Sequence, residues 1–256
     1  MKIDEVGRRR RSRDGRLHRV CIDCGPGGEV WFDTAGPTDS RPCASRPIRR
    51  RQATAVLLIA LILAAGPSMA ETVNFDAFTA GQPPPGWRAG VTGSGTSRWL
   101  VETDTGAPSG PNVLRQSGRG AFPWCVIPDA RLVDAHVQVK FKSISGREDQ
   151  AGGLVWRWKD GDNYYVARAN ALENNVSLYY TEKGRRNTIK YVDTPVSANQ
   201  WHDLSVEFVG DRIQVALDGK LYIDVRDGHI AGEGAVGVWT KADSVTAFDD
   251  FQYDKK

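Results

Sequence analysis

Residues 201–225, WHDLSVEFVGDRIQVALDGKLYIDV, determine the fold class expected for this chain. Apolar side chains occupy alternate positions on both sides of the pair Gly210-Asp211, and they do so again after Asp218-Gly219. Alternation with a period of two places successive side chains on opposite faces of a strand. Asp-Gly is a strong signal for a tight hairpin. The stretch therefore predicts three consecutive antiparallel strands that share one apolar face.

The same pattern continues through most of the chain after Glu71, where helical periodicity is nearly absent. Residues 135–145, AHVQVKFKSIS, place apolar side chains on one face and polar ones on the other. Eight or more antiparallel strands without helices favour two packed sheets over a small closed barrel. We therefore expect an all-β, two-sheet antiparallel sandwich of the jelly-roll type over residues 71–256. Further strands are expected at 151–160, 163–170, 175–184, 234–240 and 244–253.

Residues 49–70, RRRQATAVLLIALILAAGPSMA, have the order of a secretory signal peptide: three arginines, an apolar run and a small-residue ending. The apolar run, residues 53–65, is shorter than the roughly 20 residues that span a bilayer. We expect cleavage between Ala70 and Glu71, in preference to an uncleaved anchor. The mature chain is then secreted or periplasmic and has no membrane segment.

The preceding residues 1–48 form a basic leader that lacks apolar periodicity, and we expect it to be disordered. A start codon placed too far upstream is the interpretation that we favour for this leader. The alternative is a zinc site, because one histidine and three cysteines have a spacing found among metal ligands. A single CxxC without flanking strands is weak evidence for such a site. The four residues are His18, Cys21, Cys24 and Cys43.

The charge of the chain divides at the same boundary. Residues 1–51 carry 13 Lys/Arg and 7 Asp/Glu, residues 52–70 carry none, and the whole chain carries 34 and 31. Residues 71–256 therefore have a net charge of −3. The mature part has no basic stripe that could follow a phosphate backbone, so we expect no nucleic-acid partner.

The mature part contains a single cysteine, Cys125, in the segment FPWCVIP. It cannot form a disulfide within the mature chain, and it is therefore either buried and inert or paired between chains. Its apolar neighbours favour a place in the core. No histidine adjoins it, which argues against a nucleophilic role.

From Phe75 to Tyr253, the layout resembles the concanavalin A-like (laminin G-like) jelly roll. Within that fold it is similar to the bacterial secreted domains of the 3-keto-disaccharide hydrolase, or family 16 glycoside hydrolase-like, type. Three segments carry the resemblance: AGGLVWRWKDGDNYYVARAN, WHDLSVEFVGDRIQVALDGKLYIDV and GAVGVWTKADSVTAFDDFQY. The resemblance implies either a lectin-like sandwich that binds carbohydrate or a cell-envelope glycan, or a glycoside hydrolase.

Retaining glycosidases need two carboxylates about 5 Å apart, and the family 16 motif Glu-x-Asp-x-x-Glu is absent from this chain. Glu148 and Asp149 are adjacent in an expected loop. Asp203 and Glu207 share a strand face, but it is the face expected to be wet. Catalysis by residues from different strands stays open, and catalytic residues remain unknown.

Two histidines, His136 and His202, are candidate general bases. His136 begins a strand and His202 follows Trp201. His229 lies in an expected turn and has no specific role. A hydrogen-bonded structural histidine is the commoner outcome for residues of this kind.

Sugar binding requires aromatic platforms and polar side chains that reach hydroxyl groups, and both are abundant in residues 154–180. Arginine can donate a fork of hydrogen bonds to vicinal hydroxyls or to a carboxylate. We expect Arg157 to face outward beside Tyr165 and Arg168, although Tyr165 and Arg168 can share a face only across a bulge. The candidate ligand-binding residues are Arg157, Tyr165, Arg168 and Asn170.

The segments FDAF and FDDF lie near the two ends of the mature chain. If the first and last strands pair, Asp76 comes close to Asp249 or Asp250, and such carboxylates can hold calcium. A structural calcium site at Asp76 and Asp250 is therefore one expectation, and two solvated acidic edge strands are the other. Asn175-Val176-Ser177 is a glycosylation sequon that matters only in a eukaryotic secretory pathway.

Overall fold

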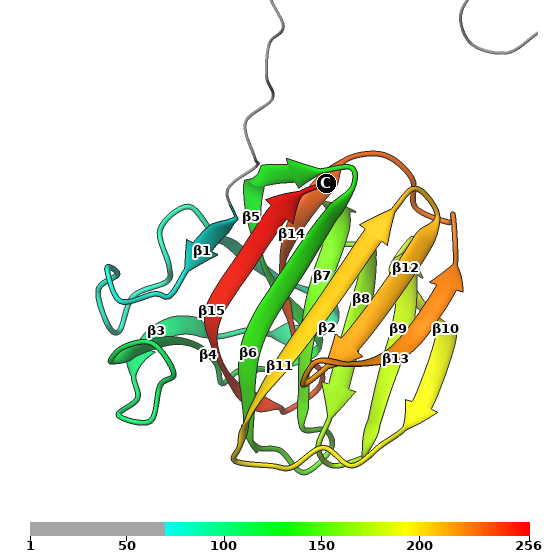
Figure 1. Ribbon diagram of the computed structural model, residues 1–256. Coiled ribbons are helices and arrows are strands. Elements are labelled where there is room, and N and C mark those ends of the chain that lie inside the picture. The colour runs from blue at the N-terminus through cyan, green and yellow to red at the C-terminus, as the bar shows by residue number, and fades with distance from the viewer. Residues whose placement is uncertain (1–69) are drawn as a thin grey trace, which may run out of the picture. The chain divides into compact units, whose positions relative to one another are not determined.

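The computed structural model describes residues 70–256, which form two antiparallel sheets packed face to face (Figure 1). This confirms the all-β, two-sheet sandwich expected from the alternating pattern. The expected leader, all but the last residue of the expected signal peptide and the four zinc-ligand candidates lie outside the described residues. Among residues 70–256, no helix has the length and apolar character needed to cross a bilayer.

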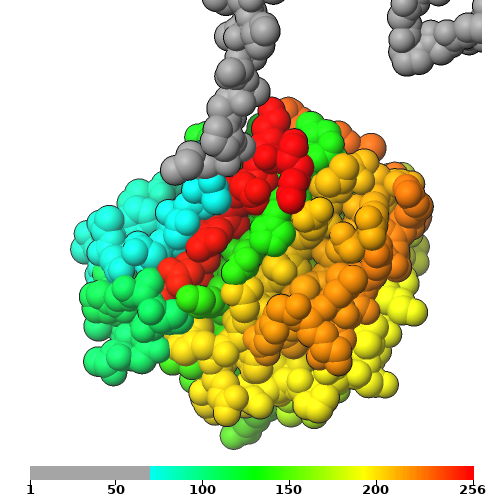
Figure 2. Space-filling view, viewed as in Figure 1, coloured from blue at the N-terminus to red at the C-terminus, as the bar shows by residue number. Residues whose placement is uncertain are grey.

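The first sheet has eight strands in the order β13-β12-β11-β6-β15-β4-β3, with β1 added beside β15. The three-strand meander predicted from residues 201–225 is its β11-β12-β13 edge. Figure 2 shows the outer surface of this sheet, which β6, β11, β12, β13 and β15 cover without interruption. Its strands are β1 (Glu71–Val73), β3 (Trp99–Thr103), β4 (Asn112–Gln116), β6 (Ala135–Ser145), β11 (Trp201–Val209), β12 (Arg212–Leu217), β13 (Lys220–Arg226) and β15 (Val245–Lys255).

The second sheet has seven strands in the order β10-β9-β8-β7-β14-β5-β2. Neighbouring strands are often far apart in sequence, as with β7 and β14, so the chain passes repeatedly between the two layers. Its strands are β2 (Arg88–Thr96), β5 (Arg119–Leu132), β7 (Ala151–Asp160), β8 (Asn163–Asn170), β9 (Asn175–Glu182), β10 (Arg185–Asp193) and β14 (Gly234–Trp239).

The main core lies between the two sheets, where apolar faces of both meet. In β6, Val137, Val139 and Phe141 are fully buried, whereas the residues between them face solvent. Burying each such side chain stabilises the fold by about 2 kcal/mol. Cys125 belongs to this core, and burial raises the pKa of its thiol. The expectation of a buried cysteine is confirmed.

The central strands of the seven-stranded sheet are buried on both faces. Its inner face contributes to the main core, and its outer face carries a second cluster that contains residues of this sheet only. An outer sheet face that faced only water would alternate between buried and exposed positions, but β7, β8, β9 and β14 are buried at nearly every position. This outer face is aromatic: it includes Trp124, Trp158, Tyr164, Tyr179 and Trp239.

The two ends of the described region lie together, because β1 pairs with β15. Glu71 is opposite Tyr253, and Val73 is opposite Phe251. The pairing of the first and last strands, on which the expected calcium site depended, is therefore present.

Candidate functional site

The register of the seven-stranded sheet aligns one cross-strand row on its outer face. Residues directly opposite each other in antiparallel strands point to the same side of the sheet. Small residues separate the large ones in this row, and Gly153 leaves room for the Trp239 ring, which lies 3.3 Å from the position of an added Cβ. From β10 to β5, the row is Tyr191, Ser177, Arg168, Gly153, Trp239 and Trp124.

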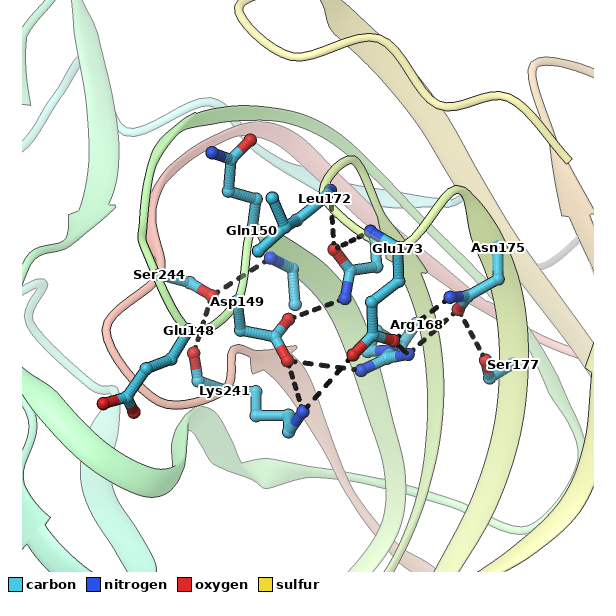
Figure 3. A network of polar contacts seen from close by, with 12 residues as sticks. Glu148, Asp149, Gln150, Arg168, Leu172, Glu173, Asn175, Ser177, Lys241 and Ser244 are labelled. Carbon is cyan, nitrogen blue, oxygen red and sulfur yellow. Dashed lines mark hydrogen bonds and ion pairs between the residues drawn. The ribbon is translucent and has the colours of Figure 1, made fainter. Parts of the chain in front are cut away.

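Arg168 is the centre of a charged network in this row (Figure 3). Its guanidinium is 1% exposed, and one terminal nitrogen donates to Glu173 over 2.6 Å and to Asn175 over 2.9 Å. Asn175 donates in turn to Glu173 over 3.1 Å and accepts from Ser177 over 2.8 Å. The guanidinium also lies 5.6 Å from the centre of the Tyr179 ring. These contacts fix the arginine in one orientation before any ligand arrives.

Asp149 joins the network from the loop between β6 and β7. Its carboxylate is fully buried and accepts from Asn170 over 2.8 Å and from the ammonium of Lys241. It also forms an ion pair with Arg168 at 3.6 Å. Lys241 lies 3.7 Å from Glu173 as well. Two carboxylates thus share two cations, and Figure 3 shows these groups converging from different strands and loops.

The environment shifts the pKa values of the two carboxyl groups in opposite directions. Burial raises the pKa of Asp149, although Lys241 and Arg168 lower it in part. Burial also acts to raise the pKa of Glu173, but Arg168 and Asn175 outweigh burial and lower the pKa overall. At neutral pH, Glu173 is therefore a firmly ionised acceptor.

The buried network has an accessible rim. The side chains of Glu173 and Lys241 are 36% and 25% exposed, and Leu172 and Tyr191 are each 46% exposed. The hydroxyl of Tyr191 accepts from Asn175, so its exposed ring is held against the network. The charged groups of Glu173 and Lys241 and the ring of Tyr191 are thus all accessible to solvent.

A cavity of about 300 Å³ is lined by two residues that are adjacent in sequence to network residues. Glu148 and Ala242, which line it, are the neighbours of the network residues Asp149 and Lys241. Its volume lies at the lower end of the range for small-molecule sites, about 300–1,000 Å³. The other lining residues are Ser94, Gly95, Arg119, Gly120 and Ala121.

Unpaired polar groups are concentrated on the same outer face. In residues 70–256, eleven buried side-chain nitrogen or oxygen atoms have no hydrogen-bond partner, and six of them belong to this face. Native proteins leave few buried polar atoms unpaired, so such a concentration calls for an explanation. The six atoms are in Trp124, Trp158, Arg168, Thr181, Arg186 and Trp239.

Of the four ligand-binding residues predicted from sequence, the structure brings two together. Arg168 and Asn170 share the outer face of β8 with Tyr164 and Val166, and both contact Asp149. The register of β8 with β9 is regular, so no bulge brings Tyr165 to this face. Tyr165 instead stacks on Trp156 in the main core, and its hydroxyl donates to Asp227.

The expectation that Arg157 faces outward was wrong. The register of β7 slips between Trp156 and Asp160, and Arg157 has a φ of 46°. This bulge turns Arg157 inward and Trp158 outward. The guanidinium donates to the backbone carbonyls of Ile230, Val133 and Gly210 over 2.6–3.2 Å. Arg157 thus ties three loops together.

Three further residues of the site, Lys241, Arg186 and Tyr191, were not among those predicted from the sequence. Lys241 follows a strand and meets Asp149 only because distant segments pack together. Tyr191 faces outward because β10 contains a register shift between Thr188 and Lys190, which simple alternation does not predict. No local signal in the sequence identifies these side chains as neighbours of Arg168.

The three histidines do not meet a carboxylate of this network. Both ring nitrogens of His202 are used, by Asp218 at 2.7 Å and by the backbone oxygen of Ser197 at 3.0 Å. His136 is 3.5 Å from Asp254. His229 stacks on Tyr180 with ring centres 3.9 Å apart.

The remaining acidic candidates lie elsewhere. Asp203 and Glu207 are half-buried on the outer face of the eight-stranded sheet, where Asp203 accepts from Gln138 over 2.6 Å. This is the wet face expected from the sequence. In the loop before β7, Glu148 is 54% exposed, whereas its neighbour Asp149 is buried, so the two point apart.

The proposed calcium ligands each have another partner. Asp250 accepts from the ammonium of Lys140 over 2.7 Å, and Asp76 accepts from the backbone of Asn112 over 3.1 Å. Asp249 accepts from Ser109. Within residues 70–256, no group of three His, Cys, Asp or Glu side chains is placed to hold a metal ion. These residues fit a cation poorly, because an ammonium group already neutralises Asp250.

Comparison with known proteins supports the fold. No family model matches the chain. The levanase of Bacillus subtilis is 29% identical over 157 residues, which are 60% of this chain and 21% of the enzyme. The chain thus spans about a fifth of the length of that relative.

Two solved structures share the architecture. The carbohydrate-binding module CBM66 from Bacillus subtilis has a TM-score of 0.55 and 24% identity, and the match covers 69% of this chain and 99% of the module. The β-glucanase of Bacillus licheniformis has a TM-score of 0.51 and 14% identity, with 75% and 99% covered. The fold is therefore the concanavalin A-like jelly roll that the sequence resemblance implied. The closer resemblance to 3-keto-disaccharide hydrolases stays a prediction.

Proposed function

We propose that residues 71–256 bind carbohydrate on the outer face of the seven-stranded sheet, at the network around Arg168. The observation that carries this proposal is the preorganised charged network itself. Burying an ion pair such as Arg168 and Asp149 does not normally stabilise a fold more than apolar residues would. A network of this kind beside exposed rim residues is better explained by binding than by folding.

The network offers the groups that a sugar needs. Glu173 and Lys241 reach the surface while their partners stay fixed below, so they can accept from and donate to hydroxyl groups without being ordered first. Immobilising a flexible side chain on binding costs about 1 kcal/mol, and preorganisation removes this cost. The Tyr191 ring supplies an apolar face beside these polar groups. Sugars present the matching combination of hydroxyls and apolar C–H faces.

The similarities with other proteins add support. A levanase and a carbohydrate-binding module are among the proteins that this chain resembles. We therefore include levan, with glycans of the bacterial cell envelope, among the first ligands to be tested.

The test is a glycan array followed by calorimetry with the glycans that bind. Glu173→Ala and Lys241→Ala should each weaken binding at least tenfold, because a lost hydrogen bond to a charged group costs roughly 1.5–3 kcal/mol. The controls are Glu182→Ala on β9 and Lys220→Ala on the opposite sheet, both exposed. Equal losses in the control variants, or no glycan binding at all, would rule out this site.

A glycoside hydrolase of the 3-keto-disaccharide type is the second candidate. It is favoured by one observation: Asp149 and Glu173 have pKa values shifted in opposite directions, as acid and base pairs of glycosidases often do. Against it, Asp149 is fully buried and cannot reach a glycosidic oxygen in this conformation. Chromogenic glycosides decide the question: hydrolysis that Glu173→Gln abolishes would establish the enzyme.

We also propose that the chain is exported and that it works either outside the cell or in the periplasm. The support is the signal-peptide order of residues 49–70. N-terminal sequencing of the protein recovered from the cell envelope or medium should begin at Glu71. A chain that begins before Arg49 would contradict export by cleavage.

A further inference from the structure

The third cation of the candidate site, Arg186, points to a particular class of ligand. Arg186 lies on β10 opposite Thr181, on the same outer face as Tyr179 and Arg168. Its guanidinium carbon is 4.7 Å from the centre of the Phe122 ring, 4.4 Å from that of Tyr179 and 5.9 Å from that of Trp239. Three aromatic rings therefore surround one cation.

Arg186 differs from the other two cations because it has no carboxylate partner. Arg168 and Lys241 are both within ion-pair distance of Asp149 and Glu173. Among residues 70–256, no carboxylate oxygen comes within 4.0 Å of the Arg186 guanidinium, and one of its terminal nitrogens is buried without an acceptor. The aromatic faces attract the cation but accept no ordinary hydrogen bond from it.

The charges of the site therefore do not cancel. Asp149 and Glu173 supply two negative charges, whereas Arg168, Lys241 and Arg186 supply three positive ones. Arg186 is close enough to both carboxylates and to Arg168 to experience their fields. This local excess of positive charge stands out in a mature chain whose net charge is −3.

We propose, on the basis of the proposed carbohydrate-binding function, that this site prefers a sugar bearing a carboxylate and that Arg186 binds that group. A planar guanidinium matches a carboxylate with two parallel N–H···O bonds. A bound carboxylate would give this guanidinium the anionic partner that it lacks and would complete the charge balance. The remaining hydroxyls of the sugar would meet Glu173, Lys241 and the Tyr191 ring. The class of ligand is therefore a uronic-acid glycan.

The experiment compares uronate oligosaccharides with the same oligosaccharides reduced at the carboxyl group to neutral sugars. Galacturonate, glucuronate and mannuronate pairs are titrated calorimetrically, with levan as a neutral glycan and a carrageenan oligosaccharide as a sulfated one. We expect at least one uronate to bind ten times more tightly than its reduced counterpart. Raising NaCl from 50 to 500 mM should weaken uronate binding and leave neutral glycans largely unaffected, because salt screens exposed charges.

Variants of Arg186 test the residue directly. Arg186→Gln should lower uronate affinity at least tenfold and change neutral-glycan affinity less than twofold, and Arg186→Lys should lose only part of the preference. Arg185→Gln is the matched control: it is the adjacent, exposed residue of the same strand and faces the other way. The melting temperature of each variant is measured alongside.

The outcomes separate this inference from the proposed function. If neutral glycans bind as tightly as uronates, or if Arg186→Gln leaves the preference intact, the carboxylate inference is overturned and carbohydrate binding stands. Tighter binding of the sulfated oligosaccharide than of every uronate also overturns it. If no glycan binds, both fail.

Discussion

Asn175 donates a hydrogen bond to the hydroxyl of Tyr191 over 2.6 Å, and this bond ties an exposed aromatic ring to a buried charged network. The ring is 46% exposed, although a tyrosine side chain on an edge strand could move freely without such a bond. The same Asn175 side chain accepts from Arg168. The Asn175 side chain therefore positions both the Tyr191 ring and the Arg168 guanidinium.

We predict that Tyr191→Ala weakens glycan binding about fivefold, because the loss of a stacking ring costs roughly 1 kcal/mol. Tyr191→Phe keeps the ring but loses its anchor, and its effect should be smaller. Titration calorimetry with the best glycan measures both. Tyr222→Ala is the control, since its hydroxyl is also hydrogen-bonded, to Thr194, but it lies on the other sheet. An affinity unchanged in Tyr191→Ala would show that this ring does not contact sugar.

We predict that Asp149→Asn destabilises the fold by roughly 2 kcal/mol. The substitution removes the charge that the buried Arg168 and Lys241 share, and hydrogen bonds to charged groups contribute about 1.5–3 kcal/mol. Urea unfolding measures the change in free energy. Asp129→Asn, at an exposed position of β5, should change it little. Equal stability of the two variants would mean that the network contributes nothing to folding.

Asp243 holds the loop that presents Asp149. Its carboxylate accepts from the backbone N–H groups of Arg147, Glu148 and Asp149 over 2.9–3.2 Å. Burial acts to raise the pKa of Asp243, but these three donors outweigh it and lower the pKa below 3.8. Asp243→Ala should cost about 1 kcal/mol and speed hydrogen exchange at the three amides.

The pH dependence of this contribution has a definite sign. Since the folded pKa is lowered, the stabilisation by Asp243 is fully present above pH 3.8 and is lost as the pH falls through the lowered value. The stability difference between the wild-type protein and Asp243→Ala should therefore be constant at neutral pH and shrink in acid. A difference that grows in acid would contradict this role for the carboxylate.

The fold could be predicted from the sequence because alternation is a local property. Val137, Val139 and Phe141 lie inside as their spacing indicated, and the Asp218-Gly219 pair closes the expected hairpin. Arg168 and Asn170 were also predicted, because both occur in a strand rich in aromatic and polar side chains. Because β8 has no bulge and Arg168 and Asn170 are two residues apart, both side chains point to the same face of the sheet.

The rest of the site could not be predicted because it depends on bulges and on contacts between distant segments. The positive φ of Arg157 reverses the parity of β7 at a residue that is not glycine, so no sequence signal marks the bulge. Asp149 and Lys241 are 92 residues apart and meet only through loop packing. Patterns of alternation contain no information about such a contact.

We predict that Cys125 does not react with thiol reagents in the folded protein. The thiol is 1% exposed, and burial raises its pKa, so little reactive thiolate forms near neutral pH. Mass-spectrometric mapping after treatment with iodoacetamide should find the Cys125 peptide unmodified under native conditions and modified in 6 M guanidinium chloride. Rapid labelling of the native protein would place this cysteine at the surface.

Calcium should leave the melting temperature of the wild-type protein unchanged. The ammonium of Lys140 donates to Asp250 and also lies close enough to Asp203 and Asp249 to interact with their charges. A cationic side chain therefore already partly neutralises these three carboxylates. A chelator should not lower the melting temperature either. Scanning calorimetry with 1 mM calcium and with chelator measures both effects. A rise in the wild-type melting temperature with calcium would instead establish the structural calcium site expected from Asp76 and Asp250, since only ligand binding to the folded state shifts the transition upward.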